Sequence, residues 1–282
     1  LRLVIGFAEE RIQNAFRRSG FGVSSYKGYH SRPHMSLTAT NRYFYNMRRH
    51  LYLRLNIGCS LKYYEDQRFR SYVHSRVENP STQLGLDLSR CSNITDVSAL
   101  GGVHTLTLCG CKKITDVSAL GGVHTLDLSY CDNITDVSAL GGVHTLSLSG
   151  CSNITDVSAL GGVHTLNLSL CSKITDVSAL GGVHTLDLSG CNNIIDVINM
   201  NITDVSALGG VHTLDLHGCR NITDVSALGG VHTLDLSGCN NIIDVINMNI
   251  TDVSALGGVH TLDLHGCKNI TECECSWWCT YS

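Results

Sequence analysis

The sequence contains no apolar run of about 18 residues, the length that a membrane-spanning helix requires, so no segment is expected to cross a bilayer. It has no phosphate-binding loop, because its Gly-Gly pairs follow Ala-Leu and precede expected strands rather than helices. It also has no catalytic constellation. Ser, His and Asp recur together only because a longer unit recurs, so they do not indicate a triad. The chain is therefore expected to be non-enzymatic, with no catalytic residues and no cofactor.

Aromatic residues and positive charge are scarce after residue 82. All five Phe, eight of the ten Tyr and 14 of the 20 Lys and Arg lie before residue 83, with only 5 of the 24 acidic residues. Residues 1–82 thus carry a net charge of +9 and the remainder −13. This contrast predicts two regions with different surfaces and different packing.

Beyond residue 82 the chain repeats one phrase, Leu-x-Leu-x-x-Cys, nine times. Successive column cysteines are 20 residues apart five times, and then 28, 20 and 28 apart. They are Cys91, Cys111, Cys131, Cys151, Cys171, Cys191, Cys219, Cys239 and Cys267. Self-similarity at a short fixed period predicts a solenoid with one coil per repeat.

The pattern within one repeat predicts how a coil is built. Counting Val103 as position 1, the apolar residues form an inward set, and Thr105 and Thr107 alternate outward as in a strand. The inward set is Val103, Leu106, Leu108, Cys111, Ile114, Val117 and Leu120. A Gly-Gly pair allows a tight turn before each strand. One coil cannot fold alone, so neighbouring coils must complete its core.

The segment from Val103 to Ile114 resembles the leucine-rich-repeat motif L-x-x-L-x-L-x-x-(N/C)-x-x-L. The Cys-x-x-Ile-Thr-Asp continuation is similar to the cysteine-containing repeats of F-box proteins, and the short Val-Ser-Ala-Leu-Gly-Gly return is similar to internalin-like repeats. The resemblance covers residues 83–270. It implies a mostly β repeat solenoid of the α/β class: a right-handed leucine-rich-repeat stack with one parallel sheet of about nine short strands and a helical N-terminal cap.

Residues 1–82 are predicted to be helical. Apolar residues fall on one face of a helix through about residues 37–55, and a second helix is expected to begin at Ser60 as its cap and run to Val77. Two roles remain open: a plain end cap for the first coil, or an F-box. Residues 35–46 resemble the second half of an F-box, which implies that Leu37, Arg42 and Phe44 contact a ubiquitin-ligase adaptor.

Basic and aromatic residues also alternate around residues 42–50, a pattern that is typical of nucleic-acid contact. The acidic repeat region would repel phosphate, so nucleic acid is not the expected partner.

Positions 5, 7 and 8 vary between copies while the inward set hardly changes, which is typical of a fixed scaffold with a variable concave surface. The expected partner-binding residues are Asp127, Tyr130, Ser147, Asn167, Leu170, Asp187, Asp215, His217, Asp235, Asp263 and His265. Tyr130 and Leu170 are the expected apolar anchors, because aromatic residues tend to dominate interface energy. Random drift at solvent-exposed positions is an equally weighted interpretation.

Stacked neutral imidazoles that bond to their neighbours explain the eight-residue histidine column more simply than a metal does. No metal is expected there or at the cysteines of the tail, residues 271–282. We expect the column cysteines to be reduced and buried. Asn-Ile-Thr recurs, and in a secreted solenoid glycans would crowd one edge. These two points predict an intracellular, cytoplasmic location.

Residues 191–218 and 239–266 are identical over 28 positions. Each therefore carries a short stub, near residues 195–201 and 243–249, that is expected to bulge from the stack or distort it. Their identity indicates a recent tandem duplication.

Two functions follow. One is a protein-binding scaffold that uses the concave sheet, with an adaptor-recruiting N-terminal region as in a substrate receptor of an SCF-type ubiquitin ligase. The other is a structural repeat-expansion product with no dedicated partner.

Overall fold

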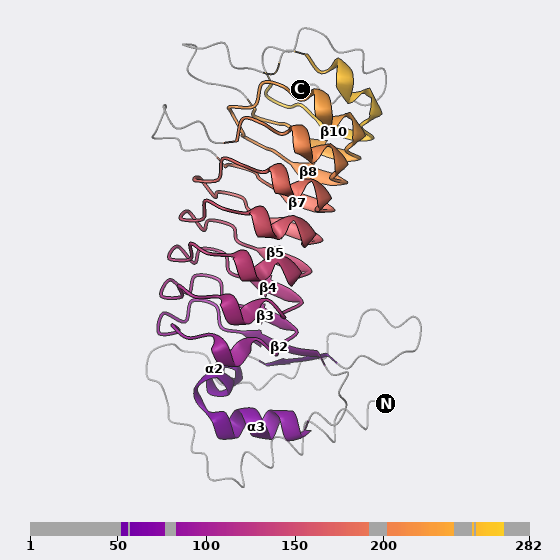
Figure 1. The fold of residues 1–282 in the computed structure, drawn as a ribbon. Coiled ribbons are helices and arrows are strands. Elements are labelled where there is room, and N and C mark those ends of the chain that lie inside the picture. The colour runs from indigo at the N-terminus through magenta and orange to yellow at the C-terminus, as the bar shows by residue number, and fades with distance from the viewer. Residues whose placement is uncertain are drawn as a thin grey trace, which may run out of the picture.

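The computed structural model describes residues 52–55, 57–76, 83–191, 202–239, 250 and 252–267. Within these ranges the chain winds into a stack of coils that rises from the helices α2 and α3 at one end to β10 at the other (Figure 1). We number the coils 1 to 9 by the strands that they carry, from β2 in coil 1 to β10 in coil 9.

One parallel sheet runs the length of the stack, with its ten strands in sequence order. They are β1 (Tyr52–Leu55), β2 (Gln83–Asp87), β3 (Thr105–Thr107), β4 (Thr125–Asp127), β5 (Thr145–Ser147), β6 (Thr165–Asn167), β7 (Thr185–Asp187), β8 (Thr213–Asp215), β9 (Thr233–Asp235) and β10 (Thr261–Asp263). Equivalent residues lie opposite each other in the repeats, as Leu106 does with Leu126. The nine predicted repeat strands are confirmed.

The tenth strand corrects the prediction of a helix through residue 55. Residues 52–55 form β1, which pairs in parallel with β2 from Tyr52 opposite Gln83 to Leu55 opposite Leu86. The rest of the predicted helix, from residue 37 to 51, lies outside the described residues. Helical periodicity failed here because the exposed edge of β2 offers unpaired backbone groups, and a strand can satisfy these whereas a helix cannot.

The second predicted helix is two helices, α2 (Ile57–Glu65) and α3 (Gln67–Arg76). Asp66 separates them: its carboxylate accepts hydrogen bonds from the backbone N–H groups of Arg68 and Phe69, at 2.8 and 3.2 Å, and so caps α3. Ser60 is not a cap, because it lies inside α2 and is fully buried. Val77 lies outside the described residues.

Residues of α2, α3 and β1 join the core of the repeats. Tyr63, Phe69 and Val73 are buried in the same hydrophobic cluster as the first coil, together with Leu55. Leu61, Tyr64 and Tyr72 are partly buried against it. The described part of the N-terminal region therefore covers the open end of coil 1. The sequence missed Tyr63 and Phe69 as buried residues.

A short 3-10 helix follows the second inward valine, such as Val117, in each of the first eight coils. These helices are η1 (Ser98–Leu100), η2 (Ser118–Leu120), η3 (Ser138–Gly142), η4 (Ser158–Gly162), η5 (Ser178–Gly182), η6 (Ser206–Gly210), η7 (Ser226–Gly230) and η8 (Ser254–Gly258). An aspartate two residues earlier binds the first N–H of each: Asp136 Oδ1 accepts from the Ser138 N–H at 2.9 Å. The aspartate of each Thr-Asp pair thus starts this segment.

The inward set forms the core. In coil 3, for example, Leu126, Leu128 and Ile134 are no more than 1% exposed. The glycine pair allows adjacent coils to approach closely: a Cβ on Gly141 would overlap the carbonyl oxygen of Ala159 in the next coil. A residue other than glycine would therefore separate the coils at this point.

The two 28-residue advances do not change the register of the sheet. β7 pairs with β8 through Leu186 and Leu214, and β9 pairs with β10 through Leu234 and Leu262. The stubs themselves, near residues 195–201 and 243–249, lie outside the described residues. Any accommodation of the extra residues therefore leaves the strand ladder intact.

Candidate protein-binding face

Position 5 of each repeat is the last residue of its strand and lies on the outer face of the sheet, which we call the sheet face. All of the predicted position-5 residues lie there: Asp127, Ser147, Asn167, Asp187, Asp215, Asp235 and Asp263, each only partly buried. The last four are adjacent in the ladder and form an unbroken column of carboxylates. Charge of one sign therefore gathers toward the C-terminal end of the face.

The position-5 aspartates also have a structural task. Asp127 Oδ1 accepts hydrogen bonds from the backbone N–H of Ser129 at 2.9 Å and from its hydroxyl at 2.6 Å. Asp215 Oδ1 likewise accepts from the His217 N–H at 2.8 Å. Each carboxylate thus closes the turn after its strand.

Burial raises the pKa of Asp215, and the neighbouring carboxylates Asp187 and Asp235 raise it further, against the hydrogen bond from His217. A cation brought to this column would relieve that repulsion. The column therefore favours a positively charged group on a partner.

Positions 7 and 8 do not lie on the strands, which corrects the expectation that they project from the sheet. They form a turn after each strand, and we call this row the turn rim, from Ser89 and Arg90 in coil 1 to His265 and Gly266 in coil 9. Position 8 adopts a positive φ in every coil. Glycine occupies it in six coils because glycine alone reaches this conformation without strain.

Three residues hold the left-handed conformation without being glycine: Arg90, Tyr130 and Leu170, with φ of 60°, 58° and 61°. Each costs about 1–2 kcal/mol relative to ordinary backbone. Tyr130 and Leu170 are also the exposed large hydrophobic residues of the described chain, at 48% and 49%. Strain and apolar exposure thus coincide at the two predicted anchors.

The turn rim alternates between large and small residues. Odd-numbered coils carry Arg90, Tyr130, Leu170, His217 and His265, whereas even-numbered coils carry only Cys or Ser followed by Gly. Tyr130 leans over Gly150 and Leu170 leans over Gly190, where an added Cβ would lie 2.6 and 2.8 Å from the covering side chain. Each large residue therefore uses the space that the next coil leaves free.

The two rim histidines are exposed. His217 Nδ1 lies 2.7 Å from Ser237 Oγ in the next coil, which fixes the ring over the even-numbered neighbour. Among the predicted site residues, the structure thus brings together those of positions 5, 7 and 8 along one edge of the sheet. Leu37, Arg42 and Phe44, the predicted adaptor contacts, lie outside the described residues.

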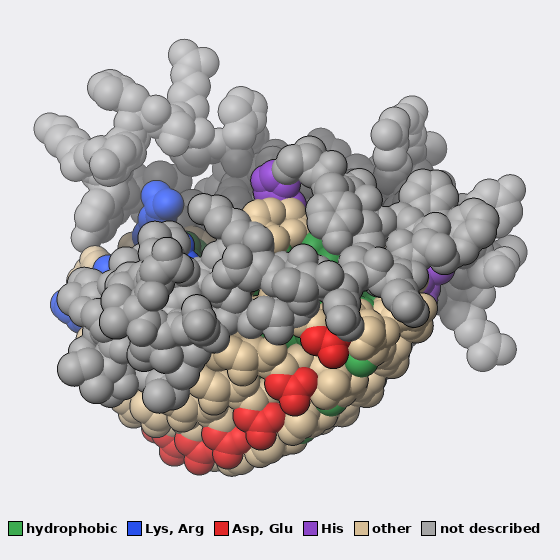
Figure 2. All heavy atoms as spheres, turned by 90° about the horizontal axis from the view of Figure 1, so that it is seen from above, with side chains coloured by type: hydrophobic (Ala, Val, Ile, Leu, Met, Phe, Trp, Pro, Cys, Tyr) green, Lys and Arg blue, Asp and Glu red, His purple; other side chains and the backbone are tan. Residues whose placement is uncertain are grey.

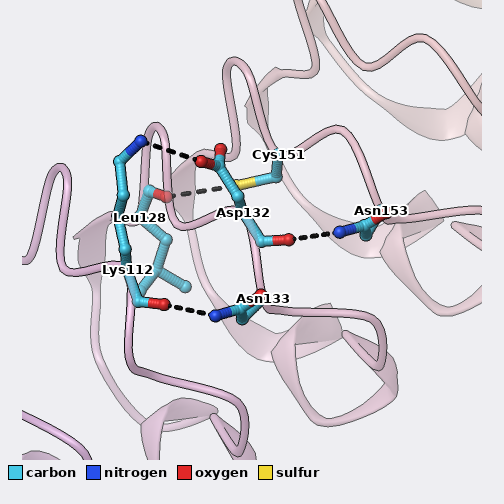
Figure 3. Close-up of polar contacts among 6 residues, drawn as sticks. All are labelled: Lys112, Leu128, Asp132, Asn133, Cys151 and Asn153. Carbon is cyan, nitrogen blue, oxygen red and sulfur yellow. Dashed lines mark hydrogen bonds and ion pairs between the residues drawn. The ribbon is translucent and has the colours of Figure 1, made fainter.

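The buried cysteine column has a structural role. Each thiol from Cys111 onward donates to a leucine carbonyl of the preceding coil, as Cys151 Sγ does to Leu128 O at 3.2 Å (Figure 3). These cysteines are free, and burial raises the pKa of the Cys151 thiol to about 12. Burial is confirmed for seven of the nine column cysteines, whereas Cys91 and Cys267 at the two ends are only partly buried.

The same side of the stack is held by polar contacts between coils. Asn133 Nδ2 donates to Lys112 O at 2.7 Å, and Asn153 Nδ2 donates to Asp132 O at 2.6 Å (Figure 3). The Lys112 ammonium lies 3.0 Å from Asp132 Oδ2. These two asparagines therefore link each coil to the one before it.

The histidine column is a stack of parallel imidazoles, with ring centroids 4.6–4.7 Å apart from His104 to His260. Each Nδ1 lies within hydrogen-bond distance of the following threonine hydroxyl, for example 3.2 Å from His144 to Thr145. Stacking and bonding to neighbours are confirmed. No group of three or more His, Cys, Asp or Glu suited to a metal ion occurs in the described residues.

Acidic side chains also line the outer surface, in a row that follows the stack (Figure 2). The 3-10-capping aspartates are exposed, and the hydrogen bonds that they accept from serine lower their pKa, as at Asp136.

Among the described helices, none has the length and apolar content to cross a membrane.

Solved structures of other proteins share this architecture. The complex of TLR13 with ssRNA13 aligns with 76% of this chain and 32% of its own, at 18% identity and a TM-score of 0.52. Internalin C2 from Listeria monocytogenes aligns with 60% of this chain and 74% of its own, at 24% identity and a TM-score of 0.44. No protein-family model and no curated protein matches the sequence. The likeness shows the fold, a leucine-rich-repeat solenoid.

Sequence reasoning missed the left-handed turn and the alternation on the rim. The signal was present, since six of nine residues at position 8 are glycine and the other three fall in alternate coils. Glycine at a fixed repeat position indicates either a positive φ or a close approach of the backbone.

Proposed function

We propose that this leucine-rich-repeat solenoid is a scaffold that binds a protein partner along the sheet face and the adjoining turn rim. The observation that carries the proposal is the conformation of Tyr130 and Leu170. Both are half-exposed, and both stand at a left-handed position where most coils use glycine. Backbone strain of this kind concentrates at binding sites, where a useful side chain outweighs it.

The surrounding residues support the same function. The core beneath the rim is nearly invariant between coils, so side chains at positions 5, 7 and 8 are presented at fixed spacing. The serine hydroxyls below Tyr130 and Leu170 are bonded, as Ser169 Oγ is to Asn167 Oδ1 at 2.7 Å. A rigid surface with a few apolar anchors among polar groups is typical of interaction sites.

The test compares partner capture by the full chain and by a Tyr130→Gly, Leu170→Gly variant. Glycine is native to position 8 elsewhere, so this variant keeps the fold, and Thr135→Ala, at an exposed position outside the sheet face and the turn rim, is the matched control. The proposal expects a binding protein that is retained by wild type and Thr135→Ala and lost by the glycine variant. A binding profile identical for all three chains would contradict it.

The finer proposal is that the chain is the substrate receptor of an SCF-type ubiquitin ligase. It is supported by the F-box-like pattern of Leu37, Arg42 and Phe44, which would recruit the adaptor while the solenoid holds the substrate. The test is binding of purified adaptor to the full chain, with Leu37→Ala and Phe44→Ala as the disrupting variants. Absence of adaptor binding by a folded wild-type chain would sink this finer proposal and leave the scaffold proposal standing.

A second candidate is a repeat-expansion product without a dedicated partner. The 28-position identity between residues 191–218 and 239–266 favours it, because recent duplication explains identical copies without selection on any site. It expects the capture experiment to detect no protein whose binding depends on the rim.

A further inference from the structure

Tyr130 and Leu170 are placed on the turn rim with a symmetry that a general binding scaffold does not require. Tyr130 stands in coil 3 and Leu170 in coil 5, so they are symmetric about Gly150 in coil 4. At the 4.6 Å spacing of the stacked rings, the two anchors are separated by about 9 Å. A two-fold axis through coil 4 would therefore bring Tyr130 of one chain against Leu170 of another, twice.

We propose that a second copy of this chain is the partner of the turn rim, bound antiparallel about a two-fold axis at Gly150. This inference rests on the proposed function, because it names the partner of the same surface. The four apolar side chains would form the centre of an isologous interface, in which each contact occurs twice.

Charge provides an independent check of this register. The axis at coil 4 places coil 1 of one chain opposite coil 7 of the other. Coil 1 carries the exposed Arg90 on the rim and Asp87 on the sheet face, and coil 7 carries Asp215 on the sheet face together with His217. The register that joins the apolar anchors thus also brings a guanidinium to the carboxylate column, at both ends of the interface.

The rim is already ordered for such a contact. Tyr130 and Leu170 rest on Gly150 and Gly190, whose missing side chains leave that space. The serines beneath are linked across coils, Ser169 Oγ to Ser149 Oγ at 2.8 Å. Little conformational entropy is therefore left for binding to remove. The interval from coil 1 to coil 7 is about 28 Å at this spacing, a length that suits a protein interface.

The first experiment is sedimentation equilibrium of the full-length chain, from about 1 to about 100 µM. Wild type is expected to dimerise. Tyr130→Gly and Leu170→Gly each remove two contacts per dimer and are expected to raise its Kd about 30-fold or more. Thr135→Ala, at an exposed position outside the turn rim, is the control. A monomeric wild type, or a dimer that neither glycine variant weakens, would overturn the inference.

A charge exchange tests the register. Arg90→Glu alone and Asp215→Arg alone are each expected to dissociate, because each places two like-charge pairs in the dimer. An equimolar mixture is expected to associate, since both pairs are restored between unlike chains. A mixture that stays monomeric while wild type dimerises would exclude this register. If wild type is monomeric but Tyr130→Gly still abolishes capture of another protein, self-association fails and the proposed function survives.

Discussion

The ring of Tyr130 covers Gly150 in the following coil, so that a Cβ built on Gly150 would lie 2.6 Å from Tyr130 Cδ1. Gly110 occupies the equivalent turn one coil before Tyr130 and has almost the same φ, 73° against 72°. A Cβ on Gly110 would meet Arg90 Cγ only at 3.4 Å. The two glycines thus share one backbone strain and differ in the side chain above them.

This pair isolates the contact between Tyr130 and Gly150. Gly110→Ala is expected to lower the free energy of unfolding by about 1–2 kcal/mol, the cost of alanine in the left-handed region. Gly150→Ala is expected to cost about 1 kcal/mol more, because the ring must move. In a Tyr130→Gly background the two costs should become equal. Urea unfolding measures these free energies. If the difference between the two alanine variants stays the same in the Tyr130→Gly background, the packing argument is refuted.

The glycine pair between coils gives a second prediction. Gly141→Ala would push a methyl group into the carbonyl oxygen of Ala159, which belongs to the backbone and cannot rotate away. The variant is expected to lose about 1–3 kcal/mol of unfolding free energy. Gly102 has no atom within 4 Å of an added Cβ, so Gly102→Ala is the matched control and should be neutral or slightly stabilising. Equal effects in thermal melts would contradict the close approach.

Ser60 links the N-terminal segment to the first repeat strand. Its hydroxyl donates to Leu55 O at 3.2 Å and accepts from the Asp87 N–H at 3.1 Å. Ser60→Ala removes both hydrogen bonds at a buried position and is expected to cost about 1–3 kcal/mol. Ser71, exposed on α3, is the control, and Ser71→Ala should change the unfolding free energy by less than about 0.5 kcal/mol. Amide exchange of the Asp87 N–H should accelerate only in the first variant.

The repeats were predictable because the same pattern occurs in nine copies, so apolar residues that occur by chance in one copy do not obscure it. The core column and the strand at positions 3–5 both follow from periods of two and twenty. Position 8 was not predicted correctly, because the exceptions Tyr130 and Leu170 suggest a variable exposed surface, whereas the glycine in the other six coils indicates a turn.

The N-terminal region could not be predicted as well, since each of its elements occurs once. A helical pattern across residue 55 is ambiguous until the open edge of β2 is known, and only that edge selects a strand. Ser60 is similar. A serine before apolar residues favours a helix cap, yet here it serves a strand 27 residues away. A backbone hydrogen bond to a residue far along the chain leaves no pattern in the local sequence.

Thiol reactivity should separate the cysteine column from Cys109. Burial raises the pKa of Cys151 to about 12, so almost no thiolate exists at neutral pH and the folded protein protects it. Cys109 is partly exposed on the rim, although burial raises its pKa as well. Among these two, a thiol reagent should label Cys109 first and Cys151 only on unfolding, as read by mass spectrometry. Early labelling of Cys151 would mean that the core opens locally.

The histidine column predicts a loss of stability in mild acid. Burial lowers the pKa of His144 below its ordinary 6.5, and the neighbouring His124 and His164 lower it further. The unfolded chain therefore binds protons before the folded one does. Stability is full above about pH 6.5 and falls as the pH drops from there toward the folded pKa. The capping aspartates, whose pKa values are lowered from 3.8, affect stability only at more acidic pH.

Urea unfolding between about pH 7.5 and about pH 5 measures this slope. The midpoint is expected to fall steadily across the range in wild type. His144→Asn should flatten the slope, because it removes one titrating ring together with its repulsion of His124 and His164. Asp215, whose pKa is raised, has the opposite effect on stability. The folded chain binds this proton more readily than the unfolded chain, so Asp215 increases the free energy of unfolding as the pH falls toward 3.8. A midpoint independent of pH in wild type would show that stacked rings 4.6 Å apart do not resist protonation.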